Sequence, residues 1–396
     1  MRSNKIMMVA GEASGDLHGT RLMEEIQRLD SEIHFWGVGG KGMERRGMEL
    51  LYRSESLSVV GITEVLFKLR FTLKVLNDLK AALEREKPDL VILIDFPDFN
   101  LRLAKAAHQK GIPVLYYISP QVWAWRPGRV KQIARWVEKI IVFFPFEVPI
   151  YEAAGADVEW VGHPLLDIVK PTLSEEEAFR RFGIEPGRRM VGLLPGSRVH
   201  EVDRLLPNLL GAAELIQKEI PEVRFIMPLA PGLSQTVFLP WLEKASIPVN
   251  VVEGWTYDVM NISELLITAS GTATLEGGIL GKPMVIVYRV SFLSYLIGRL
   301  LIRVEHIGLS NLVAGKGIAP ELIQGDVNPE RIAREALRIL KDRGLRDEMA
   351  RSMTRVRENL GDPGAAGRAA RIVLSMLHKE DSRVQGAKDS SEILKN

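Results

Sequence analysis

The sequence predicts an α/β protein made of two domains, each built around a mostly parallel sheet. Short apolar runs alternate with helical patterns through the first 165 residues, which is typical of βαβ units. The alternation starts again at residue 190, after a proline-containing, acid-rich passage. A chain of 396 residues is also longer than one hydrophobic core usually serves. We therefore expect two open sheets whose strand ends, and any ligand, face the crevice between them.

The first domain is expected to span residues 1–165, with short apolar runs as its strands. These runs are IMMVA (6–10), IHFWGVGG (33–40), LVILIDF (90–96), PVLYYIS (113–119) and KIIVFF (139–144). Helical patterns begin at about residues 17, 100 and 147. Because parallel sheets carry helices on both faces, the near-continuous apolar character of these runs fits buried strands.

The second domain is expected to span residues 166–360. Its runs are MVGLLPGS (190–197), VRFIMPLA (223–230), VNVVEG (249–254), ELLITAS (264–270) and PMVIVY (283–288). Helices are expected at 201–219 and from residue 272, and amphipathic helices fill 328–378. Of these, 361–378 is expected to form a C-terminal helix, and 379–396 lacks apolar periodicity and is expected to be disordered.

Composition excludes several classes of protein. A net charge of +2 argues against a nucleic-acid partner, because such proteins usually carry a strong basic excess. The chain has no cysteine, and its seven histidines form no pair at i, i+4, so neither a metal site nor a thiol site is expected. The P-loop lysine pattern and GxGxxG are missing, so we expect no cofactor. The apolar stretch near residue 6 is too short for a signal peptide, and no run is long enough to span a membrane.

Two loops of the second domain are suited to an anion. In LPGSR (194–198), Ser197 is a natural N-cap and Arg198 offers a planar fork for phosphate. In ASGTATLEGG (269–278), Ser270 to Thr272 are expected to expose N–H groups at a helix start, where the helix dipole favours negative charge. Glu276, one turn later, could accept hydrogen bonds from sugar hydroxyls. Each loop alone could be a capped turn, but together they favour a nucleoside diphosphate site.

A third loop carries carboxylates. IDFPDFN (94–100) places Asp95 at the end of a buried strand, where partial desolvation would raise its pKa and let it take a proton from a hydroxyl. Asp98 follows three residues later and could instead cap the next helix. The spacing is not the D-x-D of metal-dependent sugar-nucleotide enzymes.

Two further segments point to anionic or lipid partners. Residues 119–139 interleave three tryptophans with basic residues, five positive against one negative from residue 126 onward. They could bind a sugar phosphate, an anionic lipid or a single strand of nucleic acid, or the tryptophans could be core. The helix predicted at 61–80 is apolar on two sides. Such a helix is either buried on both sides or dips one side into lipid. We expect the side with Leu69, Leu73 and Leu76 to be buried. The other side, with Phe67, Phe71 and Val75 flanked by Lys68, Arg70 and Lys74, is expected to meet an anionic membrane.

Nine motifs in this order resemble the lipid-A-disaccharide synthases, a family of inverting glycosyltransferases with the two-domain GT-B fold. The motifs are AGEASGD, GIxEV (61–65), IDFPDFN, YxISPQVWAWR, FPFE (144–147), GHPLLD (162–167), LPGSR, ASGTATLE and SNLVAG (310–315). The last is the one departure, since the family has PNLLAG. The likeness extends to about residue 378 and implies two Rossmann-like domains.

The resemblance implies a reaction and roles. UDP-2,3-diacylglucosamine would donate its sugar to 2,3-diacylglucosamine 1-phosphate, giving the β(1→6) disaccharide 1-phosphate and UDP. Asp95 would be the base, with Asp98 and Glu12 as alternatives. The other assignments are diphosphate binding by Ser197, Arg198, Ser270, Gly271, Thr272 and Asn311, ribose binding by Glu276, and acceptor binding by Ser14, Trp125, Arg126 and Arg129. The protein would be cytoplasmic and bound peripherally to the inner face of the cytoplasmic membrane. The sequence does not decide between a monomer and a homodimer.

The loop VAGEASGD (9–16) is assigned to the acceptor rather than to the nucleotide. Its carboxylates would repel a diphosphate, so Gly11 and Gly15 are expected to let the backbone approach a sugar while Glu12 and Ser14 bind hydroxyls or assist Asp95. Asp16 is expected to cap a helix beginning at residue 17.

Two alternatives remain open. Another GT-B enzyme, such as a UDP-N-acetylglucosamine transferase or a 2-epimerase, would share the anion site but lack the tryptophan-rich loop and the doubly apolar helix. A non-catalytic peripheral membrane protein that binds lipid would give no reason for Arg198, Glu276 and Asp95 to converge.

Overall fold

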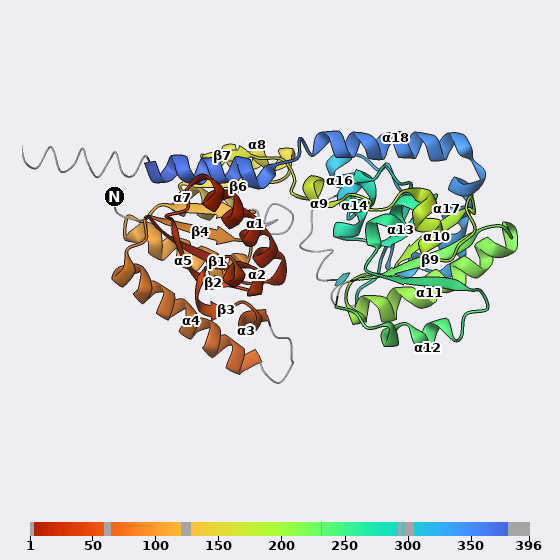
Figure 1. Ribbon diagram of the computed structural model, residues 1–396, viewed down its shortest axis with the longest axis horizontal. Helices are drawn as coiled ribbons and strands as arrows, with labels where there is room; N and C mark the ends of the chain where they lie inside the picture. Colours follow the sequence, from red (N-terminus) through yellow and green to blue (C-terminus); the bar gives the residue numbers. More distant parts are fainter. Residues whose placement is uncertain are drawn as a thin grey trace, which may run out of the picture. The chain divides into compact units, whose positions relative to one another are not determined.

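The computed structural model describes residues 4–58, 65–119, 128–230, 232–291, 295–296 and 305–378, without the side chains of residues 58 and 65–69. The chain divides into two compact units (Figure 1). Unit 1 combines Met1–Pro164 with Asp362–Asn396, and unit 2 is Leu165–Gly361. The C-terminal segment thus returns to the first unit, whereas the sequence pattern gave no reason to place it there.

Unit 1 is built on a seven-stranded sheet in the order β3-β2-β1-β4-β5-β6-β7, and every pair is parallel. The strands are β1 Lys5–Ala10, β2 His34–Gly39, β3 Glu49–Arg53, β4 Leu90–Ile94, β5 Val114–Tyr117, β6 Lys139–Val142 and β7 Val158–Trp160. The helices are α1 Ala13–Leu29, α2 Lys41–Arg45, α3 Glu55–Ser58, α4 Val65–Glu86, α5 Pro97–Gln109, α7 Gly128–Trp136 and α8 Val148–Glu152, with the 3-10 turn η2 Pro145–Glu147.

Both faces of this sheet are covered. Along β1, Met7 and Val9 enter the core beneath α4, α5 and α7, while Ile6, Met8 and Ala10 enter the core on the other face. This period of two on a strand buried on both sides explains the uninterrupted apolar run in the sequence.

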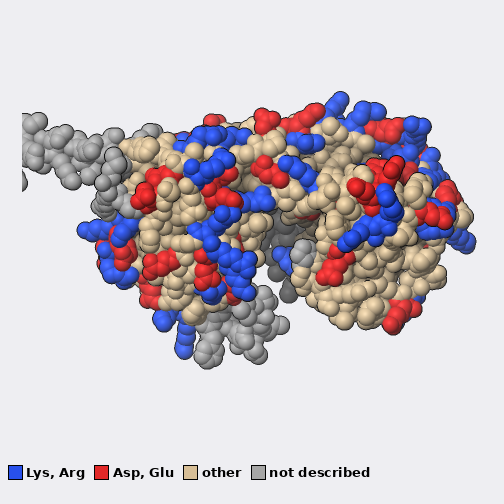
Figure 2. Space-filling model, viewed as in Figure 1, with Lys and Arg blue, Asp and Glu red and all other residues tan. Residues whose placement is uncertain are grey.

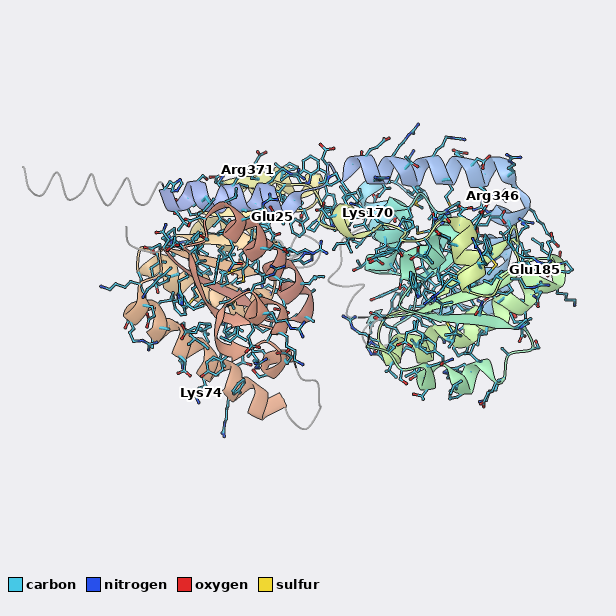
Figure 3. The ribbon with its side chains drawn as sticks, in the orientation of Figure 1. Glu25, Lys74, Lys170, Glu185, Arg346 and Arg371 are labelled. Atoms are coloured by element: carbon cyan, nitrogen blue, oxygen red, sulfur yellow. The ribbon has the colours of Figure 1, made fainter. Side chains whose placement is uncertain are left out.

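A helix over 365–378 completes the second of these cores. Its Ala369 and Val373 are fully buried there, and in Figure 1 it lies over α1. Arg368 Nε donates to the Val161 carbonyl at 2.8 Å, which fastens the returning chain to the end of the sheet. A Cβ on Gly367 of this helix would lie 3.2 Å from Glu25 Oε2 of α1, so the two helices pack closely there; Figure 3 labels Glu25.

Unit 2 repeats the design with a six-stranded, all-parallel sheet in the order β10-β9-β8-β11-β12-β13. The strands are β8 Met190–Leu194, β9 Arg224–Leu229, β10 Val249–Glu253, β11 Leu265–Ala269, β12 Met284–Tyr288 and β13 Glu321–Ile323. The helices are α9 Leu165–Ile168, α10 Glu175–Arg181, α11 Val199–Glu219, α12 Leu239–Leu242, α13 Thr256–Ile262, α14 Thr272–Ile279, α16 Leu309–Ala314, α17 Pro329–Lys341 and α18 Arg343–Asn359. Two 3-10 turns, η3 Gln235–Val237 and η4 Gln324–Asp326, complete the set.

Charges are well mixed on the surface. On the face drawn in Figure 2, acidic and basic side chains are interspersed over both units, as the net charge of +2 suggests. Anion binding therefore has to come from local geometry rather than from a broad basic surface.

Candidate active site

A cavity of about 930 Å³ opens at the carboxyl ends of the strands in unit 2. That volume lies in the range of ligand sites, and the carboxyl edge of an open parallel sheet is where such sites form. Its wall is made by loops that follow β8, β9, β10 and β11. The lining residues include Lys170, Thr172, Gly196, Ser197, Arg198, Glu201, Trp255, Tyr257, Asp258, Ser270, Gly271, Thr272, Ala273 and Glu276.

The LPGSR turn lies in this cavity as expected, between β8 and α11. Gly196 adopts φ +117°, a conformation that favours glycine. Arg198 is exposed at the mouth of the turn, with 69% of its side chain accessible. The backbone N–H groups of Ser197 and Arg198 point to the carboxylate of Glu201.

The ASGTA turn forms the opposite wall and leads into α14. Gly271 is its N-cap residue with φ +145°. Thr272 and Ala273 occupy the first turn of α14, where an α-helix leaves N–H groups without intrahelical partners and carries the positive end of its dipole. The backbone at this helix start is therefore suited to an anion.

The expectation for Ser270 needs correction. Its N–H donates to the Val287 carbonyl at 2.9 Å, which continues the sheet, and its hydroxyl donates to the Ile307 carbonyl at 2.8 Å. Both donors are used within the protein. Ser270 therefore shapes the wall, and the N–H groups available to a ligand begin after it.

Glu276 lies one turn into α14 and is half-buried. The Tyr257 hydroxyl donates to its Oε1 at 3.0 Å. Burial raises the pKa of Glu276, and the Tyr257 hydrogen bond opposes that rise. One oxygen is thus fixed by Tyr257, which orients the carboxylate toward the cavity that both residues line.

Asn311 does not join this group. It is fully buried, its Nδ2 donates to the Ala319 carbonyl at 2.8 Å and to Glu321 Oε1 at 2.7 Å, and its Oδ1 accepts from the N–H groups of Ile318 and Ala319. The carboxamide has no capacity left for a diphosphate. Its observed role is to hold the loop after α16 against β13.

Sequence reasoning missed several residues of the cavity wall. Asp258 is buried and accepts from the N–H groups of Thr172 and Leu173, both at 2.7 Å, and from the Thr172 hydroxyl at 3.0 Å. These bonds tie the segment carrying Lys170 and Thr172 to the start of α13. A partnership across 86 residues has no local signal in the sequence.

Trp255 and Tyr257 were also missed. Both follow β10, and the Arg181 guanidinium lies over the Trp255 ring, 5.3 Å from the ring centre. The signal that could have found them is their position directly after a strand, in the stretch EGWTY.

In unit 1, Asp95 directly follows β4 and has an unusual backbone conformation. Asp95 and Phe96 both have positive φ, +46° and +47°, and non-glycine residues seldom adopt such angles. The Asp95 carbonyl accepts from Asn100 Nδ2 and from the Tyr116 hydroxyl, both at 2.7 Å. This support holds a strained strand-to-helix turn that turns the half-buried Asp95 out of the strand direction.

Burial raises the pKa of Asp95, the negative charge of Glu12 raises it further, and a hydrogen bond from the Phe96 backbone opposes both. The structure therefore brings Glu12 and Asp95 into electrostatic contact, as the sequence suggested. Glu12 is the exposed N-cap residue of α1, and Ser14 is exposed in the first turn of that helix.

Asp98 has different surroundings. Its side chain is 69% exposed in the first turn of α5 and forms an ion pair with Arg129, which is only 16% exposed. The pair links two residues that we had assigned separately, one to catalysis and one to the acceptor. The Asp98 carboxylate is already engaged by the Arg129 guanidinium, whereas Asp95 is half-buried, and this favours Asp95 over Asp98 as the base.

The loop 9–16 is built differently from our expectation. α1 already begins at Ala13, and Asp16 caps another helix: its Oδ1 accepts from the N–H groups of Gly40 and Met43, and its Oδ2 accepts from Gly42 N–H, at 2.8–3.0 Å. These are the first N–H groups of α2.

The glycines of this loop have packing roles. A Cβ on Gly11 would lie 2.5 Å from the Phe96 ring, and one on Gly15 would lie 3.2 Å from Ala10 Cβ. Gly11 thus makes room for Phe96 next to Asp95, and Gly15 lets α1 pack closely on β1. Close approach to a sugar is not needed to explain either.

The membrane-facing side of α4 is also revised. Phe71 packs against the core and meets the Tyr52 ring edge-on at 6.0 Å, and Val75 is fully buried, whereas Leu73 is 38% exposed. Arg70 and Lys74 are exposed, and Lys74 projects from the outer side of α4 in Figure 3. Phe71 therefore faces inward, and the expected second apolar side is not formed by it.

Four expected site residues, Phe67, Lys68, Trp125 and Arg126, lie outside the described side chains. Of the tryptophans in the 119–139 segment, Trp136 packs partly against the unit 1 core, with Lys105 Nζ 5.7 Å from its ring centre. Within the part of the chain that the structure describes, no cluster of three metal-binding side chains is found. Over the same residues, no helix has the length and apolar character to cross a membrane.

Comparison with known proteins identifies the fold. The Neisseria meningitidis UDP-GlcNAc 2-epimerase aligns with 95% of this chain and 100% of its own at a TM-score of 0.61, with 15% identity. The Acinetobacter baumannii MurG aligns with 94% and 100% of the two chains at a TM-score of 0.60, with 16% identity. At such identities the likeness shows the fold alone, and it confirms the expected GT-B architecture of two parallel-sheet domains.

Sequence relatives are much nearer. The lipid-A-disaccharide synthase of Syntrophus aciditrophicus is 49% identical over 382 residues, covering 96% of this chain and 100% of the relative. That of Geobacter sulfurreducens is 48% identical over 378 residues, covering 96% and 98%. The family profile described as lipid-A-disaccharide synthetase matches residues 6–375. This chain therefore belongs to the lipid-A-disaccharide synthetase family.

Proposed function

We propose that the protein joins UDP-2,3-diacylglucosamine to 2,3-diacylglucosamine 1-phosphate, forming the β(1→6) lipid A disaccharide 1-phosphate and UDP. The observation that carries the proposal is the unit 2 cavity, which is lined by the LPGSR turn, the start of α14 and Glu276. Together they suit a nucleoside diphosphate: two anion-binding turns and one carboxylate for the ribose. Membership of the lipid-A-disaccharide synthetase family is the reason for proposing acylated sugars as the substrates.

The donor site neutralises the diphosphate with fixed groups. Arg198 supplies a guanidinium, Lys170 an ammonium, and the N–H groups of Gly271 and Thr272 stand at the positive end of α14. Glu276, held by Tyr257, accepts hydrogen bonds from the ribose hydroxyls. These interactions strengthen as negative charge develops on the departing UDP, so they stabilise the transition state more than the ground state.

Asp95 acts as the general base. Its carboxylate takes the proton of the acceptor 6-hydroxyl while that oxygen bonds to C1 of the donor sugar. The bond from C1 to the diphosphate oxygen breaks at the same time, and UDP leaves with the electron pair, which inverts the anomeric centre. Burial and Glu12 raise the pKa of Asp95, and a base with a raised pKa accepts a proton more readily.

The acceptor is assigned to unit 1. Arg129, held beside Asp98, supplies a cation for the 1-phosphate, and Arg126 and Trp125 belong to the same segment. Ser14 and Glu12, exposed at the start of α1, offer hydrogen bonds to sugar hydroxyls. Asn311 supports the donor side only by fixing its loop.

The substrates are lipids, so we propose that the protein acts at the inner face of the cytoplasmic membrane as a peripheral protein. The exposed Arg70, Leu73 and Lys74 of α4 support this, because a cationic rim around an apolar side chain suits an anionic leaflet. Phe67 and Lys68 belong to the same segment of the sequence.

Release of UDP tests the proposal. The purified chain is mixed with both acylated sugars, and UDP and a disaccharide 1-phosphate are measured by coupled assay and mass spectrometry. Both products should appear in equal amounts and only when both sugars are present. Release of UDP with a non-acylated acceptor, or conversion of UDP-N-acetylglucosamine to its 2-epimer, would instead favour another GT-B activity. Vesicle binding without any turnover would favour a non-catalytic lipid-binding protein.

A further inference from the structure

The phosphate-binding turn of unit 2 already contacts an anion, and that anion is Glu201 of the same chain. Glu201 Oε2 accepts from the N–H groups of Ser197 at 3.0 Å and Arg198 at 3.3 Å, and its Oε1 accepts from Arg198 Nη1 at 3.1 Å. Two backbone donors and one guanidinium thus converge on one carboxylate. These are the donors that the turn would offer to a phosphate group.

The carboxylate fills the concave side of the turn. A Cβ built on Gly196 would lie 2.5 Å from Glu201 Oε2 and 2.7 Å from Glu201 Cβ, so glycine is needed here to admit the side chain. Glu201 lines the cavity together with Gly196, Ser197 and Arg198. A phosphate and this carboxylate cannot occupy the same N–H groups at once.

Ordinary helix capping accounts for only part of this arrangement. In α10, Glu177 Oε2 accepts from Ser174 N–H at 2.9 Å and from its hydroxyl at 2.8 Å, while Glu177 N–H donates back to Ser174 Oγ. That reciprocal capping box lies on the surface, and its hydrogen bonds join Ser174 and Glu177 alone. In α11 the N-cap residue is Arg198, which has no acceptor atom, so the box is one-sided and includes an ion pair instead.

We propose that Glu201 is a placeholder for the donor phosphate: it holds the donors of the LPGSR turn in place without nucleotide and is displaced when the diphosphate binds. The inference rests on the proposed UDP site. Displacement costs little free energy, because Glu201 is 27% exposed and Arg198 69% exposed, and ion pairs at the surface contribute little to stability. The same competition would help UDP to leave after transfer.

Calorimetric titration of the full-length protein tests this. Glu201→Gln keeps a side chain that can cap α11 but removes the charge that competes with phosphate. It should bind UDP about two- to fivefold more tightly than the wild type, the range that loss of one exposed ion pair gives. Binding of uridine, which has no phosphate, should be unchanged. Glu177→Gln, the matched change in the capping box of α10, should alter neither.

Two further readouts keep the result decisive. Glu201→Ala, which also removes the cap, should melt at a lower temperature and still bind UDP more tightly. If Glu201→Gln binds UDP equally or more weakly with an unchanged melting curve, Glu201 positions Arg198 or only caps the helix, and the placeholder role is wrong. An equal gain for UDP and uridine would also overturn it. If the wild type binds no UDP, the donor site itself is misassigned and the inference falls with it.

Discussion

Tyr257 donates its hydroxyl hydrogen to Oε1 of Glu276 at 3.0 Å, joining the start of α13 to the first turns of α14 in the wall of the unit 2 cavity. The bond fixes one oxygen of a half-buried carboxylate and favours its charged form. The first turns of two helices that follow different strands are thereby joined in one wall of the cavity.

The first prediction concerns this pair. Glu276→Gln should weaken UDP binding by about tenfold or more, because hydrogen bonds to a charged group contribute about 1.5–3 kcal/mol. Tyr257→Phe should weaken it less, since it only frees the carboxylate and raises the pKa of Glu276 further. Calorimetry with UDP and with 2′,3′-dideoxy-UDP measures both. An equal loss for the two nucleotides in Glu276→Gln would place Glu276 away from the ribose.

The second prediction concerns the base. Asp95→Asn should lower kcat by a factor of about 10² to 10⁴, as loss of a general base does, while the melting temperature changes little. Asp98→Asn serves as the control. Asp98 is exposed and paired with Arg129, so its removal should affect KM more than kcat. A near-normal kcat for Asp95→Asn would assign the proton transfer to another group.

The pH profile gives an independent check of the same residue. Asp95 works as a carboxylate, so kcat should rise with pH through its pKa, which burial and the charge of Glu12 raise above the usual 3.8. Glu12→Gln removes one of the two raising effects and should move the acidic limb to lower pH. An unmoved limb would show that Glu12 is not coupled to the titrating group.

The third prediction concerns the cap of α2. Asp16→Ala should lower the free energy of unfolding by about 1–3 kcal/mol, because three N–H groups at the start of α2 lose their acceptor. Asp30→Ala is the control, since Asp30 Oδ1 accepts from Glu32 N–H at an exposed site and should matter by less than about 0.5 kcal/mol. Urea unfolding compares the two, and equal losses would contradict the capping role.

The fourth prediction concerns the membrane. Reversing both Arg70 and Lys74 to Glu should weaken binding to phosphatidylglycerol vesicles by at least tenfold, since each basic residue near an anionic surface contributes about 1 kcal/mol. Binding to neutral phosphatidylcholine vesicles should change little. The control reverses Arg334 and Arg338, exposed at the same four-residue spacing on α17. If both double variants lose binding equally, α4 is not the membrane contact.

Much of the fold and part of the site followed from local patterns. A strand followed by a polar turn and a helix is a local signal, and it placed Asp95 at the end of β4 and Gly271 and Thr272 at the start of α14. The near-continuous apolar runs predicted parallel strands with both faces buried. The motifs gave the family, because nine of them in order are far more specific than any one.

The side of α4 that faces the core did not follow from periodicity. Apolar residues occur on two sides of this helix, and the pattern favoured burial of Leu73 over Phe71 and Val75. The structure buries Val75 and packs Phe71 on the core because the neighbouring β3 and α5 decide which side is covered. When a helix is apolar on two sides, its residue pattern fits burial of either side.

The residue patterns along the chain predicted the succession of strands and helices, the two turns suited to an anion, and the family. Which polar groups are already hydrogen-bonded within the protein could be seen only in the folded chain. Asp16 accepts hydrogen bonds from N–H groups 24–27 residues away, and Asp258 accepts from an N–H group 86 residues away. Asn311 is hydrogen-bonded within the loop that follows it, and Glu201 accepts from the LPGSR turn. The physical reason is that a hydrogen bond depends on the positions of two groups in space, and the residue types along the chain name the donors and acceptors without pairing them.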